Sequence, residues 1–369
     1  MTDDRLRLAP AGRMGQSHGM TMLSDLYRLQ GPFASVVVRT PSSVSDAAHR
    51  LEIRWKNARR DLEAAGASHK LLARFDGLVA RVDHGHQTGG IAALITADDE
   101  PLVELLSDDP NKNTTRLAAI PTVTPLLASR QAALPHVVAF VDRTGADLAA
   151  VSAGSIEDYV IVEGELTHIH RGQQGGWSQR RYQQRAENRW ESNANEVADA
   201  LSDLVRRVGA RLVCVSGDVR AVGFLYDHLP ADLKPLVVIL QEGESEAVWA
   251  AADRAIAELV QQDSDVLVSS VADRRPHRTA TTNTSDVLRA LGEGRVQALI
   301  VHDDGSDELD AWCGSTLDPT ASLHQSRDDL VRGRLVDVAV RSALLTQAEV
   351  RVVSAPPSEE GPVAALLRW

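Results

Sequence analysis

Arginines gather in one short, glycine-containing segment of an otherwise acidic chain. Residues 171–189 contain five arginines and a single acid, Glu187, whereas the 369-residue chain as a whole has a formal net charge of −12. The glycines at 172, 175 and 176 let the backbone approach a surface closely. Arginine binds phosphate through paired hydrogen bonds, and an indole such as that of Trp177 can stack on an unpaired base, a contact of about 1–3 kcal/mol. The segment therefore has the composition of a local RNA contact.

Eight residues of this segment are the candidate RNA-binding residues. They are Arg171, Gly175, Gly176, Trp177, Gln179, Arg180, Arg181 and Arg185. The alternative is an ordinary solvated helix face, with Trp190 in the core of the same helix. Residue types alone favour this solvated face over an RNA contact.

Other residues with possible chemistry have simpler explanations. Asp142 and Asp218 at strand ends could hold two metal ions, as in ribonuclease H, but both lie where turn chemistry also explains them. The acidic run from Asp303 to Asp310 lacks EF-hand spacing and favours a solvated loop. His84 and His86 have only Asp83 as a nearby acidic partner. Neither a metal nor another cofactor is therefore predicted.

Several function classes lack their sequence signatures. There is no Walker A sequence for nucleotide hydrolysis, and Ser216-Gly217 is not part of a Gly-x-Ser-x-Gly elbow. Two cysteines, Cys214 and Cys313, are too few for a disulfide framework or a zinc site and are expected to be buried. No apolar run reaches the roughly 18 residues of a membrane span, and the start has no signal-peptide core. A reducing cytoplasm is the expected location.

Apolar spacing predicts alternating strands and helices. In the first part we expect a strand at 33–38, helices at 44–62 and 71–82, and a hairpin of 90–95 with 101–105. In the middle we expect strands at 137–141, 146–153, 158–163, 212–216 and 236–240, and helices at 179–208, 221–229 and 244–262. In the last part, helix–strand units at 287–291, 298–301, 330–345 and 350–353 are typical of three layers.

Pro121, Pro125 and Pro135 predict a first boundary near 131–135, and an Arg/Thr/Pro-rich stretch at 273–283 predicts a second linker. The expected organisation is a disordered extension over 1–20, an N-terminal α/β domain over 21–132, a central domain over 133–275 and a C-terminal domain over 276–369.

Segments spread along the chain resemble archaeal and eukaryotic peptide chain release factors and Pelota. Gly361-Pro-Val-Ala-Ala-Leu-Leu-Arg368-Trp369 resembles the ending of Pelota. Leu212-Val-Cys-Val-Ser-Gly217-Asp-Val-Arg, followed by Phe224-Leu225, resembles the strand, glycine turn and helix of the release factor central domain. Residues 171–181 lie where that family carries its Gly-Gly-Gln loop. Gly31-Pro-Phe-Ala-Ser-Val-Val resembles the opening of the bacterial branch, which includes Balon-type ribosome hibernation factors.

This resemblance implies an α/β multidomain protein with an N-terminal α/β domain, a ribonuclease-H-like central domain and a C-terminal α/β/α domain. It implies a cytoplasmic protein without a membrane partner that binds the 70S ribosome through rRNA of the A site and the peptidyl-transferase centre. Elongation factor Tu is a further implied partner. With the resemblance included, an RNA contact at 171–189 is favoured over the solvated helix face.

One departure from the family bears on catalysis. Trp177 stands where release factors have the glutamine that helps position water, and an indole has one donor and no acceptor. Gln173, Gln174 and Gln179 are near, but a shift of two residues moves a group by several ångströms, and about 1 Å can cost roughly a hundredfold in rate. The stop-codon motifs Asn-Ile-Lys-Ser and Tyr-x-Cys are also absent.

We therefore expect that the protein is not an enzyme and has no catalytic residues. We expect a ribosome hibernation or stress factor that occupies the A site without hydrolysing peptidyl-tRNA. Two alternatives stay open. One is a catalytically active rescue factor that hydrolyses peptidyl-tRNA with Gln174 or Gln179. The other is an RNA-binding regulator that acts without the ribosome.

Overall fold

A computed structural model describes most of the chain and divides it into two compact units. The described residues are 23–39, 47–81, 90–99, 101–106, 112–152, 155–163, 178–241, 245–305 and 309–369. One unit combines Met1–Ala132 with Gln261–Trp369, and the other is Ala133–Val260. The predicted disordered extension, 1–20, lies outside the described residues, and the predicted domain boundaries stay predictions.

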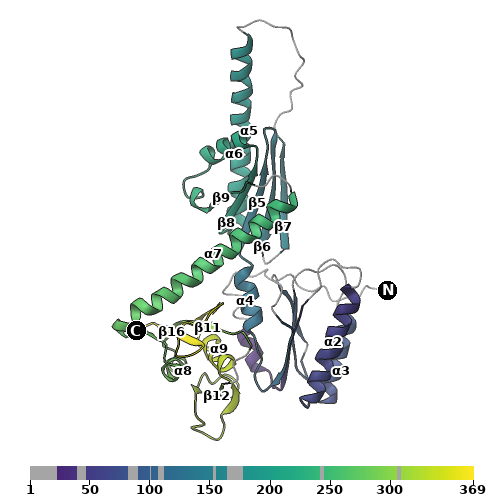
Figure 1. Ribbon diagram of the computed structural model, residues 1–369, viewed down its shortest axis with the longest axis vertical. Coiled ribbons are helices and arrows are strands. Elements are labelled where there is room, and N and C mark those ends of the chain that lie inside the picture. The colour runs from purple at the N-terminus through teal and green to yellow at the C-terminus, as the bar shows by residue number, and fades with distance from the viewer. Residues whose placement is uncertain are drawn as a thin grey trace. The chain divides into compact units, whose positions relative to one another are not determined.

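The N-terminal segment folds as an antiparallel sheet with two helices on one face (Figure 1). The strand order is β3-β2-β1-β4, with β1 (Phe33–Arg39), β2 (Gly90–Ile95), β3 (Leu102–Leu106) and β4 (Thr114–Ala118). The helices are α2 (Ala47–Ala64) and α3 (His69–Arg81). Their apolar stripes bury Leu51, Trp55, Leu62, Leu71, Phe75 and Leu78 against the sheet. The predicted strand, helices and hairpin are confirmed.

Two elements of this segment were not predicted, β4 and the helix α4 (Thr124–Ala132). Every residue of β4 is half-buried, so no alternation of apolar and polar residues marks it. In α4, Pro125 occupies the first turn, where a missing N–H breaks no helical hydrogen bond. A proline interpreted as a boundary signal is therefore part of a helix.

The C-terminal segment has three layers. Its sheet has the order β10-β16-β11-β15, with β10 (Ala280–Thr281), β11 (Val296–His302), β15 (Glu349–Val353) and β16 (Val363–Leu367). One face packs against α8 (Thr284–Gly292) and α9 (Leu335–Leu345). The other packs against Leu267, Val268 and Val271 in the second half of α7 (Ser245–Arg274). The predicted α/β/α arrangement is confirmed. A small sheet, β13-β12-β14, joins Ala321–Ser322, Asp310–Cys313 and Val331–Arg334.

These two segments share one hydrophobic core. The face of the N-terminal sheet opposite α2 contributes Val37 and Leu94, and α4 contributes Leu126. They belong to the same cluster as Leu299 of β11 and Leu335 of α9. Since separating the segments would expose this core to water, they form a single unit.

The central unit has a five-stranded sheet in the order β7-β6-β5-β8-β9. The strands are β5 (His136–Val141), β6 (Gly145–Ser152), β7 (Ser155–Glu163), β8 (Leu212–Gly217) and β9 (Val237–Ile239). β7, β6 and β5 are antiparallel, and β8 and β9 run parallel to β5. Helices α5 (Ser178–Val208) and α6 (Val219–His228) pack on one face, and the first half of α7 packs on the other. The predicted ribonuclease-H-like fold is confirmed.

Helix α7 continues past the helix predicted at 244–262 and reaches Arg274. The stretch 273–283, expected as a linker, contains the end of α7, a turn of 3-10 helix (Arg275–His277) and β10, which pairs with β16. The strand was not predicted in this polar stretch because β10 is only two residues long. No helix among the described residues is long and apolar enough to cross a membrane.

Candidate nucleic-acid interface

The predicted RNA contact lies at the start of α5 and just before it. Gln179, Arg180, Arg181 and Arg185 are in the first turns of this helix, whose backbone begins at Ser178. The other predicted residues, Arg171, Gly175, Gly176 and Trp177, lie outside the described residues. The structure therefore places the helix that carries the contact, and the contact itself stays a prediction.

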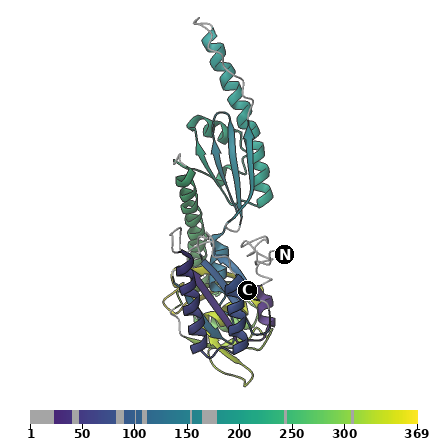
Figure 2. The ribbon, with the colours of Figure 1, turned by 90° about the vertical axis from the view of Figure 1, so that its right-hand side faces the viewer.

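The C-terminal half of α5 is anchored in the core of the central unit. Among its described side chains, the buried apolar ones are Ala194, Val197, Ala198, Leu201, Leu204 and Val205. They recur every three or four positions, so they form one stripe facing the sheet. With 31 residues the helix is about 46 Å long. Its N-terminal half extends beyond the edge of the sheet (Figures 1 and 2). A polar sequence at that end suits a segment that contacts a partner rather than the core.

A set of hydrogen bonds joins α5, α6 and the β5–β6 turn where α5 leaves the sheet. Asn193 of α5 donates to the carbonyl oxygen of Arg143 at 3.3 Å. The guanidinium of Arg143 donates to Asp218 Oδ2 at 2.9 and 3.0 Å. Asp218 in turn caps α6, accepting from the amides of Arg220 and Ala221. The base of the projecting half of α5 is thus connected to two other elements, the β5–β6 turn directly and α6 through Asp218.

Gly217 permits the close approach of β8 to β5 at this point. Its φ is +139°, and a Cβ built there would lie 1.8 Å from the carbonyl oxygen of Val141. The amide of the next residue, Asp218, donates to this same oxygen at 2.9 Å. Only glycine fits both the backbone angle and the space. The glycine turn noted in the sequence is therefore required by the packing of the two strands.

The turn explanation of Asp142 and Asp218 is confirmed. Asp142 Oδ1 accepts from the amide and hydroxyl of Thr144, both at 2.6 Å, and from the amide of Gly145 at 2.9 Å. Burial raises the pKa of Asp142, but these hydrogen bonds outweigh it, and the pKa lies below its usual value. The hydrogen bond from Arg143 lowers the pKa of Asp218. Both carboxylates are engaged in local contacts, and the described residues contain no group of three or more potential metal ligands.

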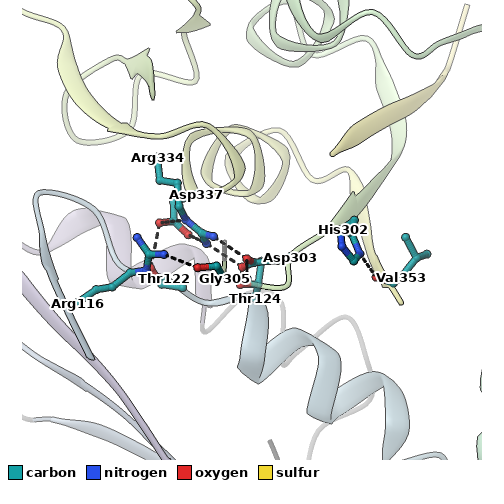
Figure 3. A network of polar contacts seen from close by, with 9 residues as sticks. All are labelled: Arg116, Thr122, Thr124, His302, Asp303, Gly305, Arg334, Asp337 and Val353. Carbon is teal, nitrogen blue, oxygen red and sulfur yellow. Dashed lines mark hydrogen bonds and ion pairs between the residues drawn. The ribbon is translucent and has the colours of Figure 1, made fainter. Parts of the chain in front are cut away.

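The acidic run that begins at Asp303 is not wholly a solvated loop, and for Asp303 that expectation is wrong. The Asp303 side chain is 6% exposed and receives two hydrogen bonds from Arg334, at 2.6 and 2.7 Å. Arg334 also donates to Asp337, at 2.8 and 3.1 Å (Figure 3). Burial raises the pKa of Asp303, but the contacts with Arg334 outweigh it and bring the pKa to about 2. Asp307 and Glu308 of the run lie outside the described residues.

This network ties the N-terminal segment to the C-terminal segment (Figure 3). Thr122 Oγ1 donates to Asp337 Oδ2 at 2.9 Å, and Thr124 donates to Asp303. Arg116 donates to the carbonyl oxygen of Gly305 at 3.2 Å. Burial raises the pKa of Asp337 above its ordinary value. Sequence reasoning missed this network, although Asp337 in the apolar run of α9 was a usable signal, because a charge in such a run needs a partner.

The strand order and the helices on both faces of the central sheet define a ribonuclease-H-like domain with a projecting helix. Residues 135–281 match the model of bacterial archaeo-eukaryotic release factor family 2. The central part of the chain is therefore similar to this bacterial family, and the predicted resemblance to the bacterial branch of the release factor and Pelota superfamily is confirmed.

Relatives with curated sequences are similar over most of the chain. Uncharacterized proteins of Mycobacterium tuberculosis strains CDC 1551 and H37Rv are each 28% identical over 289 residues, which is 75% of this chain and 76% of theirs.

Solved structures that match the chain include archaeal proteins. An archaeal translation termination factor is 16% identical, with a TM-score of 0.25 over 96% of this chain and 99% of its own. Archaeoglobus fulgidus Pelota is 10% identical, with a TM-score of 0.36 over 95% and 92%. A ribosome-bound archaeal Pelota is 14% identical, with a TM-score of 0.41 over 95% and 94%.

Proposed function

We propose that this protein is a cytoplasmic hibernation or stress factor that binds the A site of the 70S ribosome. The segment 171–189 contacts rRNA, with its loop directed toward the peptidyl-transferase centre. The observation that carries the proposal is the position of this basic segment, at the projecting end of α5 in a domain of a release factor family. In an acidic protein, such a segment supplies the local attraction to rRNA that the remaining surface lacks.

The proposed factor does not hydrolyse peptidyl-tRNA. Trp177 replaces the glutamine that positions water in release factors, and its indole cannot accept a hydrogen bond. Occupying the site without releasing the peptide is compatible with protecting an idle ribosome. Elongation factor Tu is the proposed GTPase partner, on the resemblance alone.

Ribosome co-sedimentation combined with peptide release tests the proposal. Purified protein is added to ribosomes that carry labelled peptidyl-tRNA and an empty A site. We expect the protein to pellet with the ribosomes while release stays at the spontaneous rate. Faster release that is lost in Gln174→Ala or Gln179→Ala would replace the proposal by a rescue hydrolase. RNA binding without co-sedimentation would replace it by a ribosome-independent regulator.

A further inference from the structure

Three arginines lie next to one another at one end of the C-terminal sheet. β10 and β16 are antiparallel with Ala280 opposite Leu366, and a hydrogen bond from Leu367 to the carbonyl oxygen of Thr279 continues this pairing. Arg278 and Arg368 are the next residues in that register. On the other side of β16, the Arg368 amide donates to the carbonyl oxygen of Arg295 at 2.8 Å. We call Arg278, Arg368 and Arg295 the arginine row. Neighbouring positions across strands are about 5 Å apart.

The positive charge of this region is only partly compensated. The guanidinium of Arg368 donates to the backbone carbonyl oxygens of Gly294, Thr346 and Gln347, which are neutral acceptors. Arg295 forms an ion pair with Glu293 at 3.1 Å. Two more arginines precede Arg278 closely in the chain: Arg274 ends α7, and Arg275 begins the 3-10 helix and pairs with Glu360. Among these five arginines, the ion pairs are those of Arg295 with Glu293 and of Arg275 with Glu360.

The backbone at Arg278 is also unusual for an arginine. This residue closes the 3-10 helix Arg275–His277 with φ of +59°, in the left-handed region that glycine prefers at such positions. The side chain is exposed. A charged residue in a conformation that favours glycine indicates that the charge has a use beyond the fold.

An exposed aromatic ring adjoins the row. Trp369 follows Arg368, is 67% exposed, and its carbonyl oxygen accepts from Arg295 at 3.3 Å. The indole is thus accessible to a ligand beside the guanidiniums. Arginines bind phosphates, and an indole stacks on an unpaired base. An acidic peptide could also bind the guanidiniums, but the indole beside them favours a nucleobase.

We propose that the arginine row and Trp369 form a second RNA-contact surface, which binds phosphates and one unpaired base of single-stranded RNA. The surface lies in the C-terminal segment and uses no residue of 171–189. It rests on the proposed function only in that RNA is taken as the physiological ligand. The protein would then hold rRNA at two separate surfaces.

Binding of the full chain to a labelled polyuridine oligonucleotide, followed by fluorescence anisotropy across a salt series, tests this surface. Arg278→Gly removes one charge and suits the left-handed backbone, so the fold is retained. We expect weaker binding and a log–log salt slope flatter by about 0.7 for the lost phosphate contact. Trp369→Ala should weaken binding about 5- to 150-fold with the slope unchanged, and Trp369→Phe should restore most of it. Arg289→Ala is the control, because Arg289 is exposed but paired with Asp286 within α8.

The outcomes separate this surface from the proposed function. If Arg278→Gly and Trp369→Ala bind the oligonucleotide like the parent, while Arg180→Ala with Arg181→Ala abolishes binding, the second surface is wrong and the α5 contact stands. If Arg278→Gly and Trp369→Ala both lose oligonucleotide binding but the parent does not co-sediment with ribosomes, the second surface stands and the ribosomal role fails. Binding of polyglutamate instead of polyuridine, lost in Arg278→Gly, would overturn the RNA proposal in favour of an acidic protein partner.

Discussion

Arg334 and Arg278 lie in the same unit but in opposite environments. The side chain of Arg334 is 6% exposed and donates to two carboxylates, those of Asp303 and Asp337. Arg278 is exposed on a left-handed turn beside two other arginines. A buried guanidinium must be matched by carboxylates inside the protein, whereas an exposed row of guanidiniums is available to anions from outside. Compensation by neighbouring carboxylates therefore distinguishes structural arginines from candidate binding arginines.

Removing the buried arginine should have the largest effect on stability. Arg334→Ala leaves Asp303 and Asp337 buried without their cation, so we expect a loss of about 3–5 kcal/mol in the free energy of unfolding. Chemical denaturation measures this change. The matched control is Arg332→Ala, because Arg332 pairs with Asp310 at an exposed site and should cost at most about 1 kcal/mol. Equal losses of stability in both variants would contradict the distinction between buried and exposed arginines.

The base of α5 also depends on a glycine, Gly217, in addition to the Arg143–Asp218 ion pair. Gly217→Ala should cost about 1–3 kcal/mol in backbone strain, and its Cβ also clashes with the carbonyl oxygen of Val141, which forces β5 and β8 apart. Gly223→Ala in α6 is the control, since its Cβ meets nothing within 4 Å and alanine should stabilise the helix by about 0.5–1 kcal/mol. Thermal unfolding of both variants checks the opposite signs. A stable Gly217→Ala protein would show that the close approach of the strands is not required.

The buried network should also respond to pH. The pKa of Asp303 is about 2 in the folded protein and near its ordinary value of 3.8 when unfolded. Because the folded pKa is depressed, its contribution, on the order of 2 kcal/mol, is present above pH 4 and is lost as the pH falls toward 2. Asp337 has the opposite effect on the pH dependence of stability. Burial raises its pKa, so its protonation favours the folded state.

Unfolding free energies of the parent and Asp303→Asn between pH 3 and 6 check this dependence. The stability difference between the two proteins should shrink as the pH falls. Asp318→Asn is a useful control, because the pKa of Asp318 is also lowered to about 2, chiefly by its hydrogen bonds with Thr320, at a site away from this network. A difference between parent and Asp303→Asn that stays constant with pH would argue against a depressed pKa for Asp303.

Sequence patterns predicted most elements because their signals are local. The stripes of α2 and α3 and the apolar run of β5 follow directly from apolar spacing. The shared core of Val37, Leu126 and Leu299 and the partners of Asp303 join residues far apart in the chain, which no local pattern reports. The candidate site at 171–189 came from charge and resemblance, and its side chains lie outside the residues whose contacts the structure describes. The arginine row was missed because its members are brought together only by strand pairing.

The double variant at Arg180 and Arg181 should have the smallest effect on stability and a large effect on ribosome binding. Arg180→Ala combined with Arg181→Ala changes the part of α5 that extends beyond the sheet, so the free energy of unfolding should stay within about 0.5 kcal/mol of the parent. Ribosome binding should weaken, and its log–log salt slope should flatten by roughly one to two units if both arginines contact phosphate. Trp177→Ala should lower affinity with the slope nearly unchanged, because stacking carries no charge. Co-sedimentation across a salt series distinguishes the two roles. If both variants pellet like the parent at every salt concentration, the segment 171–189 is not the ribosome contact, and its arginines belong to an ordinary solvated helix.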